Sequence, residues 1–337
     1  MARDACSAVV VGTRSIEWSV VRPEAAEPAD AGVEALPDAV VPSEGGVVGA
    51  GAEPGAGEAA EGEATSSEVP SPDRSALLRS VCGRLRGIVS MGVPSEHLIL
   101  RVATLPAESP EELSGMVQLQ VDKFSPFPVD KMVVSHEVLA KRENGFVVLM
   151  AAALEEAISA GYRELESCGV RPGVVDACVL GRWQTLLDAG AVAPQGRQVV
   201  VVLEGTQPEI VVAQDGMPIL FRQLGDASSL DAAALADEVL QETTYALTAI
   251  EMEHGGAELA GVRVVAGGQV PEAVAQAFAR DYPWVAAAGI PGDLPSVATG
   301  LARRLAARRE GEAGLTLCRR FSARWAVPVP YAGDCCE

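Results

Sequence analysis

Seven cysteines and three histidines are the residues of this chain that most often take part in metal or redox chemistry. Zinc and redox sites usually place cysteines two residues apart or histidines at helical spacing. This chain has no CxxC pair, and Cys335 and Cys336 are adjacent, while His97, His136 and His254 lie far apart. We therefore predict no metal site and no catalytic residue. The cysteines are interpreted as small hydrophobic side chains, with the last two in a tail.

The charge of the chain excludes two classes of partner. Its formal net charge is −20 at pH 7 over 337 residues. Such a chain does not attract nucleic acid or an anionic membrane through bulk electrostatics. The sequence also has no uncharged apolar run near the roughly 20 residues that span a bilayer, and no secretory signal is recognisable. We expect a cytoplasmic protein with no membrane span of its own.

Much of the negative charge lies in one block near the N-terminus. Residues 23–73 contain twelve Asp or Glu and no Lys, Arg or aromatic residue, so the block carries −12 of the −20. A segment of this composition buries too little apolar surface to offset the entropy of ordering it. We predict a disordered acidic insert over 23–71. It is either a solvated loop between two elements or an acidic arm that contacts a partner.

Elsewhere the chain alternates between strand and helix patterns. A hairpin is expected over 8–21, turning at Gly12-Thr13, and a second at Asp215-Gly216. The hydrophobic spacing predicts strands over 97–104, 131–139, 146–152, 198–203, 208–213, 219–224 and 262–266. It predicts helices over 72–88, 154–168, 231–252, 271–280 and 296–309. Each half thus indicates an α/β lobe.

Leu105–Val138 is the most informative stretch, and its first half is a well-marked amphipathic helix. Ser109 suits the N-cap position, Pro110 the first helical position, and Glu112 the reciprocal position of a capping box. The stretch then ends in KFSPFP followed by the strand-like MVVSHEV. We expect Phe124, Pro126 and Phe127 to pack and shape the turn; the other interpretation is that they line a docking groove.

This ending resembles the PilM family of actin-like proteins and the related cytoplasmic part of GspL, scaffolds of type IV pilus and type II secretion machines. Further segments resemble the family in the same order, among them VVLMAAALEEAISAGYRELESCGVRPGVVDA, LADEVLQETTYAL and GVRVVAGGQVPEAVAQAF. The resemblance runs from about residue 6 to residue 307, interrupted by the insert. It implies an α/β, actin-like (ribonuclease H-like) two-lobed fold with an extra small α+β subdomain in the first lobe.

The resemblance also implies domain boundaries. The first lobe would comprise 6–22 and 72–190, with the family-specific subdomain at 93–145. The second lobe would comprise 196–295. A closing helix over 296–310 would return to the first lobe, and 311–337 would form a tail.

A degenerate nucleotide site is implied as well. Actin-like ATPases hold the phosphates and hydrated Mg²⁺ between two loops that carry Asp-x-Gly. The resemblance places the remnant of these loops, and of the glycine pair that faces adenosine, at Gly12, Thr13, Gly205, Thr206, Gly267 and Gly268. The aspartate positions are occupied by Val10 and Leu203, which cannot order the shell of a cation. We expect no hydrolysis and no required cofactor, with ATP binding left open.

The function implied is that of a non-catalytic cytoplasmic scaffold, peripheral at the inner membrane through its partners. These would be the cytoplasmic tail of a PilN-like inner-membrane protein and the assembly ATPase of the pilus or secretion system. Two alternatives stay open on the sequence: a nucleotide-binding ATPase of the same fold, and a filament-forming actin homologue.

Overall fold

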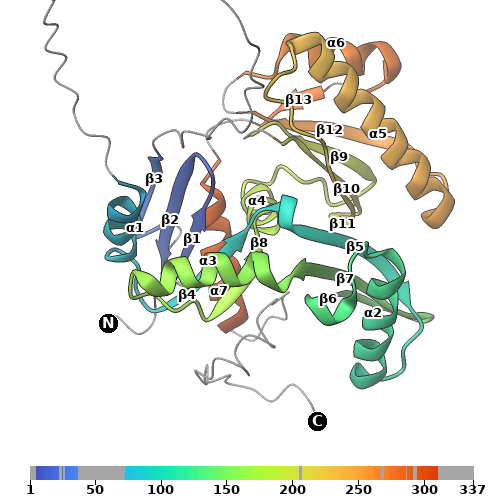
Figure 1. Cartoon of the computed structure of the whole chain (residues 1–337). Coiled ribbons are helices and arrows are strands. Elements are labelled where there is room, and N and C mark those ends of the chain that lie inside the picture. Colours follow the sequence, from blue (N-terminus) through green and yellow to red (C-terminus); the bar gives the residue numbers. More distant parts are fainter. Residues whose placement is uncertain are drawn as a thin grey trace, which may run out of the picture.

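A computed structural model describes residues 5–22, 25, 27–36, 73–204, 207–266, 269–285, 287–290 and 294–309 of the chain. The strands of this described part form three sheets, two of five strands and one of three (Figure 1). No described helix combines the length and the apolar character needed to cross a membrane.

The first lobe is built on a mixed sheet in the order β3-β2-β1-β4-β8. The predicted hairpin is present: β1 (Cys6–Val11) pairs antiparallel with β2 (Ser15–Val21), and the turn is closed by the Gly12 N–H donating to the Ser15 carbonyl. Strands β4 (Ile88–Val93) and β8 (Val174–Ala177) follow in parallel. Helices α1 (Arg74–Cys82), α3 (Glu155–Ser167) and α4 (Cys178–Asp188) complete the lobe.

Helix α1 is shorter than predicted, because 83–88 are not helical. Gly83 caps the helix, and Gly87 has a φ of +71° that suits glycine. A Cβ on Gly87 would lie 1.8 Å from the carbonyl oxygen of Ala5. This close approach lets the chain turn directly into β4, so Leu85 lies in the connection and Ile88 is the first residue of the strand.

The prediction of disorder over 23–71 is wrong for six residues. Strand β3 (Asp30–Ala35) lies inside that range and pairs antiparallel with β2. The backbone hydrogen bonds of β3 to β2 do not depend on an apolar composition. Gly32 also leaves room for the ring of Trp18, because a Cβ at position 32 would lie 2.4 Å from a ring carbon of Trp18. Residues 37–72 lie outside the described part of the chain, so the remaining prediction is not addressed.

The subdomain in the first lobe consists of β5 (Leu98–Leu105), α2 (Pro110–Phe124), β6 (Met132–Arg142) and β7 (Gly145–Leu154), with short 3-10 turns at Ser95–His97 and Val129–Lys131. Its sheet order is β5-β7-β6. Because β7 is the central strand, the subdomain extends to Leu154 and not only to residue 145. Helix α2 covers one face, burying Leu113, Val117 and Val121.

The cap of α2 follows the predicted motif with one difference. The Ser109 hydroxyl accepts from the Glu112 N–H at 3.2 Å, but the Glu112 carboxylate accepts from the Glu108 N–H at 2.8 Å, one residue before the cap. Phe124 packs against the core of the subdomain, as predicted. Phe127 is 45% exposed, so it does not share that role.

The second lobe is a sheet in the order β11-β10-β9-β12-β13, formed by β9 (Arg197–Val202), β10 (Glu209–Gln214), β11 (Met217–Gln223), β12 (Leu259–Val265) and β13 (Ala287–Gly289). Asp215 and Gly216 make the predicted hairpin turn with φ of 53° and 78°. Helices α5 (Ala232–His254) and α6 (Glu272–Asp281) cover one face (Figure 1). The closing helix α7 (Val297–Arg309) then packs against β1, β2 and α4 of the first lobe.

Candidate functional site

A cleft of about 340 Å³ lies between the two lobes and contains part of the predicted nucleotide site. Gly12 and Thr13, at the β1–β2 turn, line it from the first lobe, while Val202 and Glu204 line it from the second. The other predicted residues, Gly205, Thr206, Gly267 and Gly268, lie outside the described residues. We refer to this space as the interlobe cleft.

A carboxylate enters the interlobe cleft from a strand next to the expected one. Val10 occupies the aspartate position on β1, and its register partner on β2 is Glu17. Opposed residues of an antiparallel pair point to the same face, so both line the cleft. Burial raises the pKa of Glu17, while Arg182 and the backbone N–H groups of Ala298 and Val297 at the start of α7 oppose the rise.

Arg182 of α4 is the central cation of the interlobe cleft. It forms an ion pair with Glu204 at the end of β9, and its Nη1 donates to the Pro295 carbonyl at 2.9 Å. Burial also raises the pKa of Glu209 on β10, and Arg182 again limits the rise. The guanidinium is therefore already engaged by groups of the protein itself.

The charge of the interlobe cleft is unfavourable for phosphate groups. The charged side chains that line it are Arg14, Arg182, Glu17, Glu96, Glu204 and Glu209. Four carboxylates against two guanidinium groups leave a formal charge of −2. No three His, Cys, Asp or Glu side chains of the described residues come together as metal ligands. A nucleotide would bring further negative charge without an evident cation to offset it.

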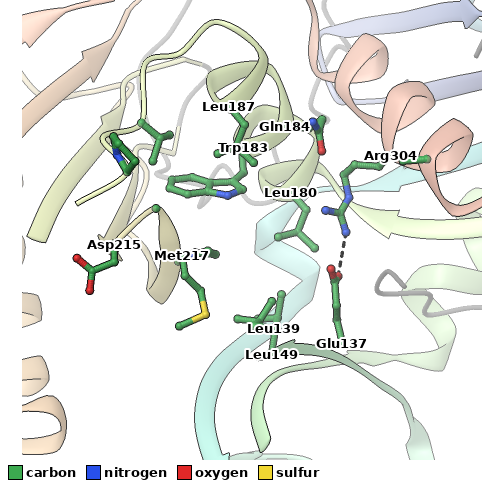
Figure 2. Close-up of a pocket in the computed structure, with 15 residues that line it drawn as sticks. Glu137, Leu139, Leu149, Leu180, Trp183, Gln184, Leu187, Asp215, Met217 and Arg304 are labelled. Atoms are coloured by element: carbon green, nitrogen blue, oxygen red, sulfur yellow. Dashed lines mark hydrogen bonds and ion pairs between the residues drawn. The ribbon is translucent and has the colours of Figure 1, made fainter. Parts of the chain in front are cut away.

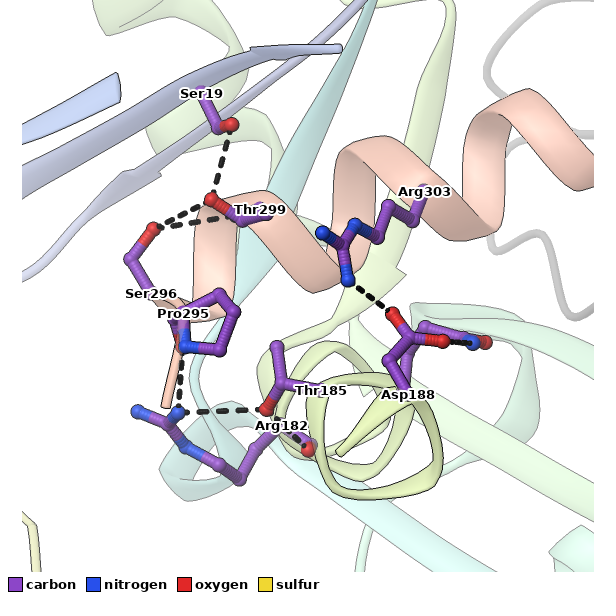
Figure 3. A network of polar contacts seen from close by, with 9 residues as sticks. Ser19, Arg182, Thr185, Asp188, Pro295, Ser296, Thr299 and Arg303 are labelled. Carbon is purple, nitrogen blue, oxygen red and sulfur yellow. Dashed lines mark hydrogen bonds and ion pairs between the residues drawn. The ribbon is translucent and has the colours of Figure 1, made fainter. Parts of the chain in front are cut away.

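Two helices connect the lobes and cross at glycines. A Cβ on Gly300 of α7 would lie 1.9 Å from the Gly181 carbonyl oxygen of α4, and a Cβ on Gly181 would lie 2.7 Å from Leu301. Around this crossing runs a polar network (Figure 3). Ser296 caps α7 through the Thr299 N–H, and the Thr299 hydroxyl donates to Ser19 on β2 at 3.0 Å. The network fixes the ends of both helices at the interlobe cleft.

A larger space of about 520 Å³ lies where α4, α7, the subdomain and the β10–β11 turn meet. Figure 2 shows its wall, in which Trp183 and Leu180 of α4 face Met217, Leu139 and Leu149. The remaining lining residues are Glu137, Gln184, Leu187, Val192, Pro194, Asp215, Gly216, Pro218, Arg304 and Ala307. We call this space the apolar pocket. Its mixture of aliphatic, aromatic and acidic side chains suits a peptide segment better than a small polar ligand.

The charged wall of the apolar pocket is a buried three-membered network. Arg304 of α7 pairs with Glu137 of β6 at 3.0 Å and with Asp176 of β8 at 3.1 Å. Burial alone would lower the pKa of Arg304, but the two carboxylates together hold it above its ordinary value. The lining carboxylates of Glu137 and Asp215 against this one cation give a formal charge of −1, and the exposed Asp215 places it at the rim.

The residues that shape both spaces were missed by the sequence analysis because α4 was not predicted. The segment CVLGRWQTLLD has a helical hydrophobic pattern, and its buried face includes Leu180, Trp183 and Leu186. A count of that periodicity would have found the helix. The position of Glu17 follows from the hairpin register, which a four-residue turn at 12–15 sets.

Comparison with known proteins was made by sequence and by structure. No protein-family model and no curated protein matches the sequence. The PilM–PilN type IV pilus biogenesis complex has a chain that aligns over 91% of this chain and 98% of its own, with a TM-score of 0.58 and 16% identity. The cytoplasmic domain of EpsL, an inner-membrane component of the type II secretion system of Vibrio cholerae, aligns over 93% and 98%, with a TM-score of 0.51 and 13% identity.

A protein of unknown function from Bacteroides thetaiotaomicron with an actin-like ATPase fold aligns over 84% of this chain and 90% of its own, with a TM-score of 0.51 and 9% identity. These likenesses establish the actin-like fold and so confirm the predicted fold class. The predicted resemblance to PilM and to the GspL/EpsL cytoplasmic domain is likewise confirmed in three dimensions.

Proposed function

We propose that this protein is a non-catalytic scaffold of a type IV pilus or type II secretion assembly platform. It would work in the cytoplasm and be held at the inner membrane by its partners. The fold shared with PilM, solved in complex with PilN, and with the cytoplasmic domain of EpsL supports this assignment. Contact with the assembly ATPase of the system belongs to the same proposal.

The apolar pocket is our candidate for the docking site of a PilN-like tail. The observation that carries the proposal is its chemistry: aliphatic and aromatic walls of Leu139, Leu180 and Trp183 with an acidic rim at Asp215. The cytoplasmic flank of a membrane-spanning helix is rich in Lys and Arg. A tail with apolar anchors and basic neighbours therefore complements both the walls and the rim.

The absence of catalysis is part of the proposal. An excess of carboxylates in the interlobe cleft and the engagement of Arg182 by Glu204 and Pro295 support it. We expect no turnover of Mg-ATP by the purified full-length chain. Arg171 is an exposed arginine outside the cleft and provides the control. If the chain hydrolysed ATP, and Arg182→Ala lost this activity while Arg171→Ala retained it, the ATPase alternative would be favoured.

A site-directed cross-link tests the docking site. Leu187 lines the apolar pocket and is 42% exposed, while Leu119 on the outer face of α2 is 65% exposed and lies outside it. A photoreactive amino acid in place of Leu187 should cross-link the cytoplasmic tail of a single-span inner-membrane protein in the native cell. The same probe at Leu119 should not.

The synthetic tail peptide then gives a quantitative check. Leu187→Lys places a positive charge at the apolar wall, where it repels the basic tail, and should raise the dissociation constant for this peptide about tenfold or more, a loss of about 1.4 kcal/mol. Leu119→Lys is the matched control and should leave the dissociation constant unchanged. Equal affinities of the two variants would contradict docking in the apolar pocket.

A further inference from the structure

The largest of the fully buried side chains among the described residues is a cation, Arg197, which is 2% exposed. It begins β9, where its Nε donates to the Gln214 side chain at 3.2 Å and its Nη2 to the Gly255 carbonyl at 3.1 Å. Its Nη1 is buried without a hydrogen-bond partner. None of the ion pairs among the described residues includes Arg197. Burying a charge without a counter-ion costs several kcal/mol, as an order of magnitude.

Beside Arg197 lies a partly open space of about 230 Å³, between the subdomain and the second lobe. The subdomain contributes Thr104, Val147 and Arg142, the exposed last residue of β6. The second lobe contributes Arg197, Gln214, Asp215, Met217, Ile219 and Ala257. Two guanidinium groups from different parts of the fold therefore line one space, which we call the arginine pocket.

The arginine pocket keeps a net positive charge. Asp215 is its one acidic lining residue. The Gly196 N–H, then Gln214 and the nearby Arg142 lower the pKa of Asp215, so this carboxyl is ionised at neutral pH. Two cations and one carboxylate leave +1. The Asp215 oxygens already accept from the Gly196 N–H at 2.8 Å and from Gln214 at 3.3 Å.

We propose that the arginine pocket binds a small aliphatic monocarboxylate, whose oxygens pair with Arg197 and Arg142. A carboxylate matches the planar donor fork of arginine. The single negative charge of a monocarboxylate balances the net charge of +1 in the arginine pocket. A phosphate dianion would exceed that charge and would be repelled by Asp215. The side chains of Val147, Met217 and Ile219 provide the apolar contact for the aliphatic body. This site shares Asp215 and Met217 with the adjacent apolar pocket, but both of its arginines lie outside that pocket, and it does not depend on the proposed scaffold function.

Isovalerate is a suitable probe, with isovaleramide as its neutral isostere. Isovalerate should raise the Tm of the full-length chain saturably, and titration calorimetry should give a single site. Isovaleramide and inorganic phosphate at the same ionic strength should do neither. N-acetyl-leucine, which mimics the end of a peptide chain, distinguishes the source: tighter binding than isovalerate assigns a protein C-terminus, and weaker binding assigns a free acid.

Three variants connect the binding to these residues. Arg142→Ala changes an exposed side chain and should weaken isovalerate binding at least tenfold without a change in fold. Arg197→Met should abolish binding, while the Tm without ligand should fall little or rise, because an uncompensated buried charge is removed. Arg101→Ala is the control, since Arg101 is an exposed β5 arginine that pairs with Glu253 outside the pocket.

The proposal is overturned if isovalerate and isovaleramide act equally, if phosphate binds and isovalerate does not, or if Arg142→Ala binds like the wild type. Absence of any binding would mean that water in the cavity solvates Arg197 instead. A large fall in the ligand-free Tm of Arg197→Met, together with unchanged isovalerate binding, would likewise make Arg197 purely structural.

Discussion

Single residues in the interlobe cleft show how its chemistry departs from that of an actin-like ATPase. Val10 stands on β1 where the resemblance leads us to expect an aspartate. The neighbouring strand β2 carries the carboxylate of Glu17, which faces the start of α7. Arg182 meets Glu204 across the cleft. The interlobe cleft is thus lined by an excess of acidic side chains and by an arginine that the protein itself engages.

Glu17→Gln should change the dependence of stability on pH. Because burial raises its pKa in the folded chain, folding favours the protonated form, and stability falls as the pH rises above about 4.5 through the raised pKa. The glutamine variant lacks this loss. Its Tm should exceed that of the wild type at pH 7 and match it near pH 4, as measured by thermal unfolding across that range.

The exposed Glu143 provides the control for this experiment. Glu143→Gln lies in the turn between β6 and β7 and should follow the wild-type profile at every pH. A Tm difference for Glu17→Gln that is equal at pH 4 and pH 7 would show that ionisation of Glu17 is not its cause.

At the scale of elements, the crossing of α4 and α7 is the contact that holds the two spaces in place. Each helix contributes to both: Arg182 and Val297 line the interlobe cleft, and Trp183 and Arg304 line the apolar pocket. The crossing is this close because glycine occupies both contact positions. A side chain at either one would separate the helices.

Gly300→Ala should therefore destabilise the protein strongly. The new Cβ would lie 1.9 Å from a backbone oxygen, and overpacking of this kind typically costs about 1–3 kcal/mol or more. Gly115→Ala in α2 places its Cβ in open space. Because alanine has a higher helix propensity than glycine, this variant should raise the free energy of unfolding by about 0.5–1 kcal/mol. Urea unfolding measures both, and similar effects at the two positions would contradict the close crossing.

At the scale of the whole molecule, Arg304 links three parts that are far apart in sequence. Its guanidinium on α7 joins β8 of the first lobe, through Asp176, to β6 of the subdomain, through Glu137. The subdomain also meets the second lobe where β5 packs against β11. The docking surface that we propose exists only where these parts come together.

Removal of Arg304 should affect the stability of the whole chain. Arg304→Ala removes the cation that pairs with both Glu137 and Asp176, of which Asp176 is 1% exposed, and breaking a buried ion pair by removing one partner costs about 3–5 kcal/mol. Arg171→Ala breaks an exposed ion pair with Glu166 and should cost less than about 1 kcal/mol. The comparison is made by chemical denaturation, and a cost for Arg304→Ala as small as that of the surface pair would contradict the role of the network.

Local patterns were sufficient for much of the architecture. The Ser109 cap, the apolar spacing of α2 and α5 and the Asp215-Gly216 turn are short-range features, so the sequence predicted those elements and, through the resemblance, the actin-like fold. The same local reasoning failed at β3, where pairing with β2 orders a polar segment, and at 83–88, where Gly87 ends a helical pattern against Ala5.

Contacts between distant residues decided the rest. The sequence by itself determined the helix caps, the hairpin turns and the aliphatic residues at Val10 and Leu203, because these depend on residue type and short-range spacing. The lobes and the inserted subdomain were predicted through the resemblance to the PilM family. Only the tertiary structure brought Trp183 to the subdomain and placed Arg197 and Arg142 at the same pocket. Those juxtapositions depend on how sheets pair and helices cross, and no local pattern along the chain encodes them.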